Sequence, residues 1–244
     1  MDIAKKQYKD VFIDFDDTIY DTRHNSQVAL EETFAYFHLE QYFSDPQVFY
    51  SAYWQANEML WRRYSLGLVT KNHLREQRFR IPLNRGLVEG WLPFSPSTAF
   101  CLKVNDWFVM RASSQPGLLP GARQLIAYLR ERGYGLHMCS NGFHEVQYRK
   151  LAACHLNGAF HNIILSEDAG VNKPDKRYFD YAFRITHAAP ATTIMIGDNQ
   201  LTDIYGAQTY EFDTIFFNPQ QHPLSPDVHP THEVSSLTEI STIL

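Results

Sequence analysis

An apolar run that ends in carboxylates is the feature that most constrains how this chain can fold. The apolar residues Val11–Ile13 lead into a second stretch, Asp14–Thr18, which reads Asp-Phe-Asp-Asp-Thr. A short run of β-branched and aromatic residues is typical of a strand buried on both faces of a parallel sheet. Ligands of open α/β sheets bind beyond the carboxyl ends of the strands. The pattern therefore predicts a first strand that delivers charged side chains to a ligand site.

The three carboxylates of this stretch, Asp14, Asp16 and Asp17, are close enough to repel one another. They need compensation from a cation, from protonation or from solvent. Side chains alternate along a strand, so Asp14 and Asp16 are expected on the same side, where both can address one ligand. A hard divalent metal meets these conditions. A solvated acidic turn after a buried strand is the alternative interpretation.

From Pro116 onward, helical and strand patterns alternate. Strands are expected over residues 135–139, 162–165, 193–196 and 214–217, and helices over 122–132, 145–153, 177–186, 203–209 and 236–244. This alternation favours right-handed crossovers and a mostly parallel sheet, which is the α/β fold class. Four prolines mark residues 218–230 as an irregular surface excursion.

Residues 25–114 show helical spacing and no clear buried strand, so we expect an all-helical insert after the first strand. Its four helices are expected around residues 34–37, 49–64, 70–80 and 97–112. Gly67 is expected to end the second helix, and the third is expected to end before Pro82. Aromatic residues recur along these segments at the spacing of a bundle core.

Composition excludes several classes of protein. With 44% hydrophobic and 20% charged residues, the chain is globular and not disordered. A net charge of −5, spread without long single-sign blocks, argues against a nucleic-acid polymer as partner. No signal-peptide core or membrane-length apolar run occurs, so we expect a cytoplasmic protein with no membrane partner. The three cysteines, without a Cys-x-x-Cys pair, are expected to be reduced and packed.

Later strands also end in residues that suit phosphate or metal chemistry. Ser140–Gly142, which reads Ser-Asn-Gly, can hold a phosphoryl oxygen through its hydroxyl and backbone amides. Pro174 restricts Lys173 to an extended conformation and can hold its ammonium group in a defined place. Asp198 follows the fourth strand and can bind a metal. The coincidence of four such strand ends predicts one shared site.

Each of these motifs also has an ordinary interpretation. Ser140–Gly142 can be a simple turn, and Lys173 can be a solvated loop lysine. Asp203 is either a first-turn acid that favours the helix dipole or a direct part of the site.

Taken together, Asp14–Thr18, Ser140, Lys173–Pro174, Gly197–Asp198 and Asp203 resemble the four ordered motifs of the haloacid dehalogenase-like hydrolases. The resemblance implies a Rossmann-like catalytic core formed by residues 1–22 and 115–244. It also implies that residues 23–114 form a helical cap. One departure is Asp17, at a position that is commonly glycine in this superfamily and for which we assign no role.

For the reaction, the resemblance implies a Mg²⁺-dependent phosphomonoesterase that forms an aspartyl-phosphate. Asp14 is then the nucleophile and Asp16 the acid/base. Lys173 neutralises the nucleophile and the phosphate. Thr18 and Ser140 steady the phosphoryl oxygens, with Asn141 assisting.

The excess of negative charge in such a site calls for a metal cation. Four carboxylates, those of Asp14, Asp16, Asp198 and Asp203, face one positive charge from Lys173 and an incoming phosphate. Mg²⁺ is therefore expected on Asp14, the Asp16 main-chain carbonyl and Asp198. Asp203 is expected in a supporting role, ordering either a metal-bound water or Lys173.

The expected partner is a small phosphorylated metabolite. A narrower resemblance, through Asp16-Asp17-Thr18, Arg78-Phe79 and overall length, points to bacterial pyrimidine 5′-nucleotidases and hence to a nucleotide. Arg78 and Arg80 are the cap candidates for substrate contact, although an arginine is usually a solvated residue. The aromatic residues Tyr50, Tyr53 and Trp54 either stack on a base or belong to the bundle core.

Three alternatives stay open. A phosphosugar mutase would use the same core residues but exclude water during transfer. A phosphatase for another small metabolite, of the phosphoglycolate type, is the second, and a non-catalytic binding protein that kept the fold is the third. Asp16 argues against carbon–halogen cleavage, because dehalogenases of this superfamily lack its proton relay.

Overall fold

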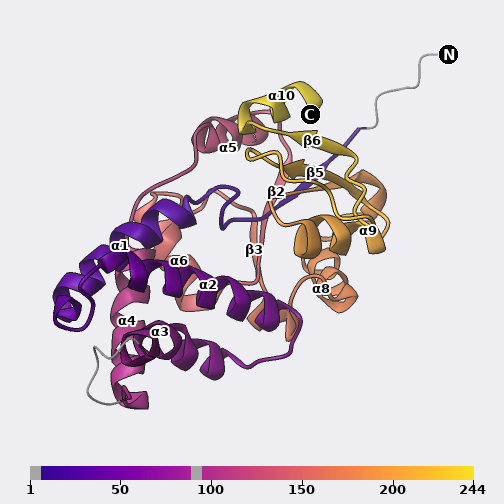
Figure 1. The fold of residues 1–244 in the computed structure, drawn as a ribbon. Helices are drawn as coiled ribbons and strands as arrows, with labels where there is room; N and C mark the ends of the chain where they lie inside the picture. Colours follow the sequence, from indigo (N-terminus) through magenta and orange to yellow (C-terminus); the bar gives the residue numbers. More distant parts are fainter. Residues whose placement is uncertain (1–6, 89–94) are drawn as a thin grey trace. The chain divides into compact units, whose positions relative to one another are not determined.

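The computed structural model describes residues 7–88 and 95–244, which divide into two compact units (Figure 1). The first unit contains the chain up to Thr22 together with Pro116–Leu244. The second unit contains Arg23–Gln115. Each unit has a hydrophobic core of its own.

A six-stranded parallel sheet forms the centre of the first unit, which confirms the predicted α/β class. The strand order is β3-β2-β1-β4-β5-β6. The strands are β1 (Asp10–Ile13), β2 (Gly135–Ser140), β3 (Asn162–Leu165), β4 (Thr193–Gly197), β5 (Asp213–Phe217) and β6 (His232–Val234). The chain moves outward from β1 first to one side and then to the other, so the carboxyl ends of β1 and β4 lie at a topological switch point, where open sheets bind ligands.

The register of the sheet aligns its strand ends. Ile13, the last residue of β1, pairs with Met138 of β2 and with Ile196 of β4. The next residue, Asp14, continues this pattern by donating its backbone N–H to the Ile196 carbonyl at 2.8 Å. The residues that follow these strands therefore leave the sheet side by side.

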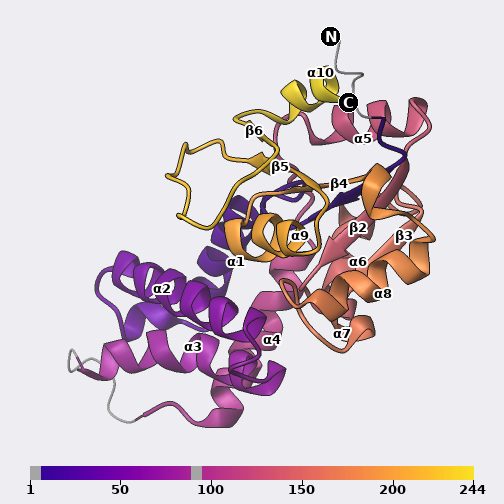
Figure 2. The ribbon, with the colours of Figure 1, turned by 90° about the vertical axis from the view of Figure 1, so that its right-hand side faces the viewer.

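Helices cover both faces of this sheet (Figure 2). Val11 and Ile13 pack on one face with α5 (Ala122–Glu131), α6 (His144–Ala153) and α10 (Ile240–Ile243). Phe12 packs on the other face with α8 (Lys176–Thr186) and α9 (Gly206–Thr209). This alternation follows the two-residue period of a strand. Shorter elements are α7 (Ser166–Ala169), the 3₁₀ turns η2 (Pro190–Thr192) and η4 (Leu237–Glu239), and the π-helical η3 (Gln200–Tyr205).

The C-terminal part of this unit differs from the prediction in three places. The strand β6 was not predicted, because it is three residues long and offers only Val234 as an apolar signal. The helix expected over 236–244 is a 3₁₀ turn followed by the single turn α10. The helix expected over 203–209 begins earlier, as η3, and becomes α-helical only at Gly206.

Residues 218–230 contain no helix or strand, as predicted, but side-chain amides hold them in place. Gln200 and Gln208 each pair one amide group with two backbone atoms of this excursion. The contacts run from Gln200 to Pro223 O (3.0 Å) and Ser225 N (2.8 Å), and from Gln208 to Asp227 O (3.1 Å) and His229 N (2.8 Å). Val228 anchors the excursion further by packing with Ile204 and Phe216.

Four long helices build the second unit: α1 (Thr22–Tyr36), α2 (Pro46–Ser65), α3 (Lys71–Val88) and α4 (Thr98–Ser113), with the 3₁₀ turn η1 (Leu39–Gln41). Its core is largely aromatic. Tyr50 and Tyr53 belong to this core, which favours the packing interpretation of both side chains. Trp54 is only partly buried, and its indole N–H donates to Gln27 at 3.0 Å.

The predicted end of the third helix before Pro82 is wrong, because α3 continues through this proline to Val88. A proline inside a helix removes one backbone hydrogen bond and normally breaks the helix. Here Phe79 and Leu83, one turn apart, are both fully buried in the aromatic core. Packing of this face outweighs the local preference for a break.

The cysteines behave as predicted, since Cys101, Cys139 and Cys154 are buried and form no disulfide. Within residues 7–88 and 95–244, no helix combines the length and the apolar character needed to cross a lipid bilayer.

Phe79 gives a direct test of the helical core. Its ring lies 5.2 Å from that of Phe108 and 5.4 Å from that of Tyr53, so it joins three helices. We expect Phe79→Ala to lower the free energy of unfolding by about 3–5 kcal/mol, measured by urea denaturation. Leu68→Ala, at a 64% exposed side chain of the same unit, should change it by less than about 0.5 kcal/mol. Equal effects of both substitutions would contradict this account of the core.

Candidate active site

Lys173 lies at the centre of a buried charge cluster beyond the ends of β1, β2 and β4. Its ammonium group donates to Asp14 Oδ1 at 2.7 Å, to Asp203 Oδ1 at 2.6 Å and to the Cys139 carbonyl at 2.7 Å. These contacts use all three N–H donors of the group. The neighbouring carboxylates outweigh burial and raise the pKa of Lys173, so this side chain stays charged.

The backbone of Lys173 is fixed by Asn141, which follows β2. The Asn141 amide donates to the Lys173 carbonyl at 2.9 Å, and its oxygen accepts the Lys173 backbone N–H at 2.8 Å. The sequence suggested Asn141 as an assistant in phosphate binding. In the structure, both polar atoms of its side chain contact the Lys173 backbone, so the side chain positions the lysine.

Three carboxylates, those of Asp14, Asp198 and Asp203, lie together in the same region, with one oxygen of each within 4.8 Å of the others. Burial raises the pKa of Asp14; Lys173 opposes this rise, while Asp203 and Asp16 add to it. Burial raises the pKa of Asp198 as well, and the charges of Asp14, Asp17 and Asp203 add to the rise. The cluster is short of positive charge, and its oxygen donors suit a hard divalent cation.

Asp203 is the most enclosed member of the cluster. Besides Lys173, it accepts the backbone N–H of Asn199 at 3.2 Å and the Thr202 hydroxyl at 3.3 Å. Gly197 makes room for it, because a Cβ at that position would lie 2.3 Å from Asp203 Oδ2. With both oxygens engaged by protein donors, Asp203 suits a supporting role better than direct metal binding.

Thr18 connects the first strand end to the fourth. Its hydroxyl donates to Asp198 Oδ1 at 3.0 Å and accepts the Asp198 backbone N–H at 3.1 Å. Thr18 is fully buried in this arrangement. The side chain that the sequence suggested for phosphate binding thus also orients Asp198.

Asp16 is held by three donors of its own, none of which was predicted from the sequence. Gln147 donates to Oδ2 at 2.6 Å, Thr22 donates to Oδ1 at 2.9 Å, and Lys150 forms an ion pair with Oδ1. Burial would raise the pKa of Asp16, but the Lys150 charge and the three hydrogen bonds outweigh it and lower the pKa. Gln147 and Lys150 lie three positions apart on α6, a spacing that puts both on one helix face.

Ser140 shares one of these donors. Its hydroxyl oxygen accepts the Gly142 backbone N–H at 2.9 Å and the Gln147 amide at 3.1 Å. Position 142 must be glycine for this contact, since a Cβ there would lie 1.7 Å from Gln147 Nε2. The Ser-Asn-Gly motif therefore forms the turn and also leaves room for Gln147 to hydrogen bond to Ser140.

Asp17, which had no assigned role, occupies a backbone position that suits glycine. Its φ of 59° lies in the left-handed region, which Asp tolerates better than most side chains. Its N–H donates to the Tyr20 carbonyl at 2.9 Å and to the Thr22 hydroxyl at 3.2 Å. The glycine common at this position in the superfamily thus has a conformational reason.

The two arginines proposed for substrate contact have different surroundings in the helical unit. Arg80 pairs with Glu76 at 2.8 Å and hydrogen bonds to Thr98, so it connects α3 to the start of α4. Arg78 is 4% exposed and donates to Asn105 at 3.2 Å. Both arginines have a buried Nε without a hydrogen-bond partner among the described residues. Burial lowers the pKa of Arg78. Of the two, Arg78 is the more deeply buried.

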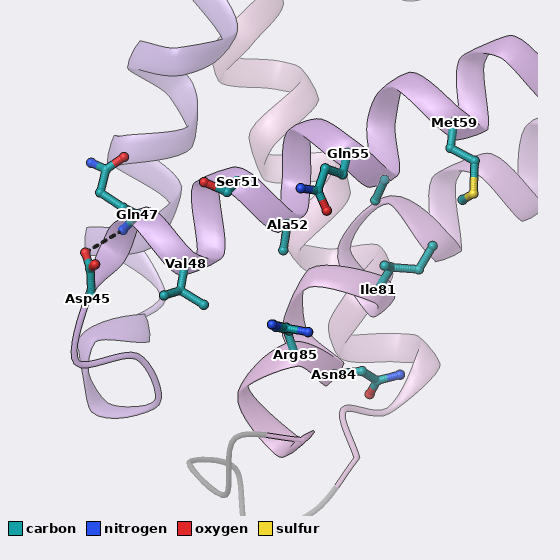
Figure 3. A pocket seen from close by; sticks show the side chains of 11 residues that line it. Asp45, Gln47, Val48, Ser51, Ala52, Gln55, Met59, Ile81, Asn84 and Arg85 are labelled. Atoms are coloured by element: carbon teal, nitrogen blue, oxygen red, sulfur yellow. Dashed lines mark hydrogen bonds between the residues drawn. The ribbon is translucent and has the colours of Figure 1, made fainter.

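The helical unit also contains a cavity of about 730 Å³ between α2 and α3 (Figure 3). Its lining mixes amides and apolar side chains, among them Gln55, Met59, Ile81 and Asn84. None of the predicted site residues lines it, so it adds no catalytic group to the carboxylate cluster.

Comparisons with known proteins agree with the motifs. The sequence model of the haloacid dehalogenase-like hydrolases matches residues 8–209. The chain is 30% identical to the putative HAD-hydrolase YfnB of Bacillus subtilis over 98% of this chain and 96% of the relative. The magnesium-bound crystal structure of YfnB superposes with a TM-score of 0.83 and covers 98% of this chain and 99% of that one.

Two further relatives are named as nucleotidases. The chain is 28% identical to the pyrimidine 5′-nucleotidase PynA of Streptococcus pneumoniae, over 96% of this chain and 93% of the relative. It is 29% identical to the pyrimidine 5′-nucleotidase YjjG of Escherichia coli, over 84% and 89% of the two chains.

The charge cluster predicts a large stability effect at Lys173. Lys173→Met leaves Asp14 and Asp203 without their shared cation, so we expect the metal-free protein to lose about 3–5 kcal/mol of unfolding free energy at neutral pH. Urea denaturation in the presence of a chelator measures this loss. Lys103→Met, at an exposed lysine of α4, is the control and should change stability by less than about 0.5 kcal/mol. An unchanged Lys173→Met protein would show that the carboxylates need no compensation.

Proposed function

The chain belongs to the haloacid dehalogenase-like hydrolases, and from this premise we propose that it is a Mg²⁺-dependent phosphomonoesterase. The observation that carries the proposal is that two carboxylates of one strand end have separate partners. Asp14 pairs with Lys173, whereas Asp16 is held by Lys150 and its neighbours. Two carboxyl groups in different environments are the usual basis for dividing nucleophile from acid/base.

The proposed metal site consists of Asp14, the main-chain carbonyl of Asp16, and Asp198. Mg²⁺ bound there supplies positive charge against the phosphate and the carboxylates. The close approach of Asp14 and Asp198 oxygens and the raised pKa of both groups support this assignment. Asp203 keeps Lys173 in place from the other side.

In the first half of the proposed reaction, an Asp14 oxygen forms a bond to phosphorus. The bond between phosphorus and the leaving oxygen breaks, and its electron pair stays on that oxygen, which takes a proton from Asp16. Asp16 enters this step protonated against the influence of Lys150. The negative phosphate favours that form, because a nearby anion raises the pKa of a carboxyl group.

In the second half, water attacks the phosphorus of the aspartyl-phosphate and gives a proton to Asp16. The bond to Asp14 breaks, and inorganic phosphate leaves. One ester and one water are thus converted to one alcohol and one phosphate, and Asp16 regains the proton that it gave. Lys173 keeps its charge throughout and stabilises the Asp14 carboxylate as it forms again.

We propose a nucleoside 5′-monophosphate as the substrate, which the two pyrimidine 5′-nucleotidase relatives support. Relatives named phosphoserine phosphatase, from Thermus thermophilus, and glyceraldehyde 3-phosphate phosphatase, from Pyrococcus abyssi, support a small-metabolite phosphatase as the competing substrate class. We assign the helical unit the role of a cap. Arg78 and Arg80, each with an Nε that has no hydrogen-bond partner among the described residues, are our candidates there for contact with the part of the substrate away from the phosphate.

The phosphatase reaction is tested by removing the nucleophile. We expect Asp14→Asn to lower phosphate release from p-nitrophenyl phosphate by at least about 10³-fold, because no covalent intermediate can form. A chelator should abolish the wild-type activity, and added Mg²⁺ should restore it. Asp106→Asn, at an exposed carboxylate of α4, is the control and should retain activity. Turnover by Asp14→Asn near the wild-type rate would contradict the proposal.

The substrate class is tested with a panel of phosphate esters assayed with and without Mg²⁺. We expect pyrimidine nucleoside 5′-monophosphates to exceed phosphoserine, phosphoglycolate and glyceraldehyde 3-phosphate at least about tenfold in kcat/KM, or about 1.4 kcal/mol. A preference for one of the small metabolites would overturn the nucleotidase assignment. Conversion of a phosphosugar to its isomer in the presence of the bisphosphate, without free phosphate, would establish the mutase alternative.

A further inference from the structure

We propose that Gln147 and Lys150 are positioning residues that fix the orientation of the Asp16 carboxylate, an inference that rests on the proposed function. Together with Thr22 they cover both oxygens of this group, with Gln147 on Oδ2 and the other two on Oδ1. Gln147 is fully buried, and the Lys150 side chain is 9% exposed. Because these donors are buried and bind both oxygens, they hold the carboxylate in one orientation.

The fold holds Lys150 itself in a defined place. Its ammonium lies 4.8 Å from the centre of the Tyr20 ring, in a cation–π contact. Tyr20 is 1% exposed and stacks on Phe15 at a ring distance of 5.7 Å. Lys150 thus contacts both the Tyr20 ring and the carboxylate of Asp16, so the loop after β1 and α6 are tied together at the acid/base.

Gln147 joins the acid/base to the proposed phosphate site. Its amide nitrogen faces both Asp16 and Ser140, and the acceptor-only carboxylate fixes which end of the amide points there. The other end, Oε1, is buried and has no hydrogen-bond partner among the described residues. Gln147 therefore contacts both the proposed acid/base and the serine expected to bind the phosphate.

The division between the two lysines explains why Asp16 needs donors of its own. Lys173 uses all its N–H donors on Asp14, Asp203 and the Cys139 carbonyl. Without Lys150, the Asp16 charge would be uncompensated next to Asp14 and would compete for Lys173. With Lys150 in place, Asp16 has a cation of its own, and the nucleophile Asp14 keeps Lys173 as its partner.

This role predicts a dependence on the leaving group. A nitrophenolate leaves without a proton, whereas an alkoxide needs one, so misplacing Asp16 costs more with an alkyl phosphate. We expect Lys150→Met to lower kcat for an alkyl phosphate such as glycerol 3-phosphate about 10–100-fold, with KM changed less than about threefold. The burst of nitrophenolate from p-nitrophenyl phosphate should fall less than about threefold. Lys150→Arg should recover most of the loss.

Gln147→Leu, which replaces the amide by an apolar side chain and removes its donor, should show the same signature and serves as the second variant if Lys150→Met fails to fold. Arg149→Met, at a neighbouring cation of α6, is the control and should retain both activities. Thermal melting confirms folding, and a crystal structure of Lys150→Met should show the Asp16 carboxylate turned to a new rotamer.

Wild-type turnover and its loss in Asp14→Asn are measured first, so a failure of the phosphatase proposal is seen in the parent protein. The positioning role fails if folded Lys150→Met and Gln147→Leu lose aryl and alkyl activity equally. It also fails if both variants retain full activity on alkyl phosphates, or if the crystal structure of Lys150→Met shows the Asp16 carboxylate in its original rotamer.

Discussion

Burial of like charges at one sheet edge is the constraint on which the rest of the first unit depends. Asp14, Asp198 and Asp203 approach one another within a few ångströms, away from most solvent. Such an arrangement persists only with nearby cations and fixed donors, because an uncompensated buried charge is strongly destabilising. Lys173 meets part of this demand, and Asn141 fixes the backbone that carries it. The remaining deficit is the physical reason to expect a divalent metal.

The same constraint organises the residues around Asp16. A single lysine shared among all carboxylates would couple the nucleophile to the acid/base, so that a charge change at one would pull on the other. The structure instead gives Asp16 a lysine from α6, whereas Lys173 comes from the loop between α7 and α8. The parallel sheet makes this possible, because the segments that follow neighbouring strands begin at the same edge of the sheet. The topology of the sheet therefore determines which lysine lies next to which carboxylate.

Sequence patterns predicted the features that depend on local composition. The strands β1 to β5 were predicted because each is a short apolar run, whereas β6 has one apolar residue and was missed. The acidic strand end was predicted because its charge directly follows an apolar strand, and Lys173 was singled out because Pro174 follows it. Gln147 and Lys150 were not found, since helical spacing shows that they share a face but not what that face meets. Passage of α3 through Pro82 was also hidden, because packing around Phe79 decided it.

The excursion over residues 218–230 shows how a chain without regular structure keeps a constant shape. Gln200 and Gln208 bind only main-chain atoms of this segment, much as a neighbouring strand would. The contour of the segment is thus independent of most of its own side chains. The chemistry that the segment displays can therefore be changed by single substitutions, without rebuilding the loop.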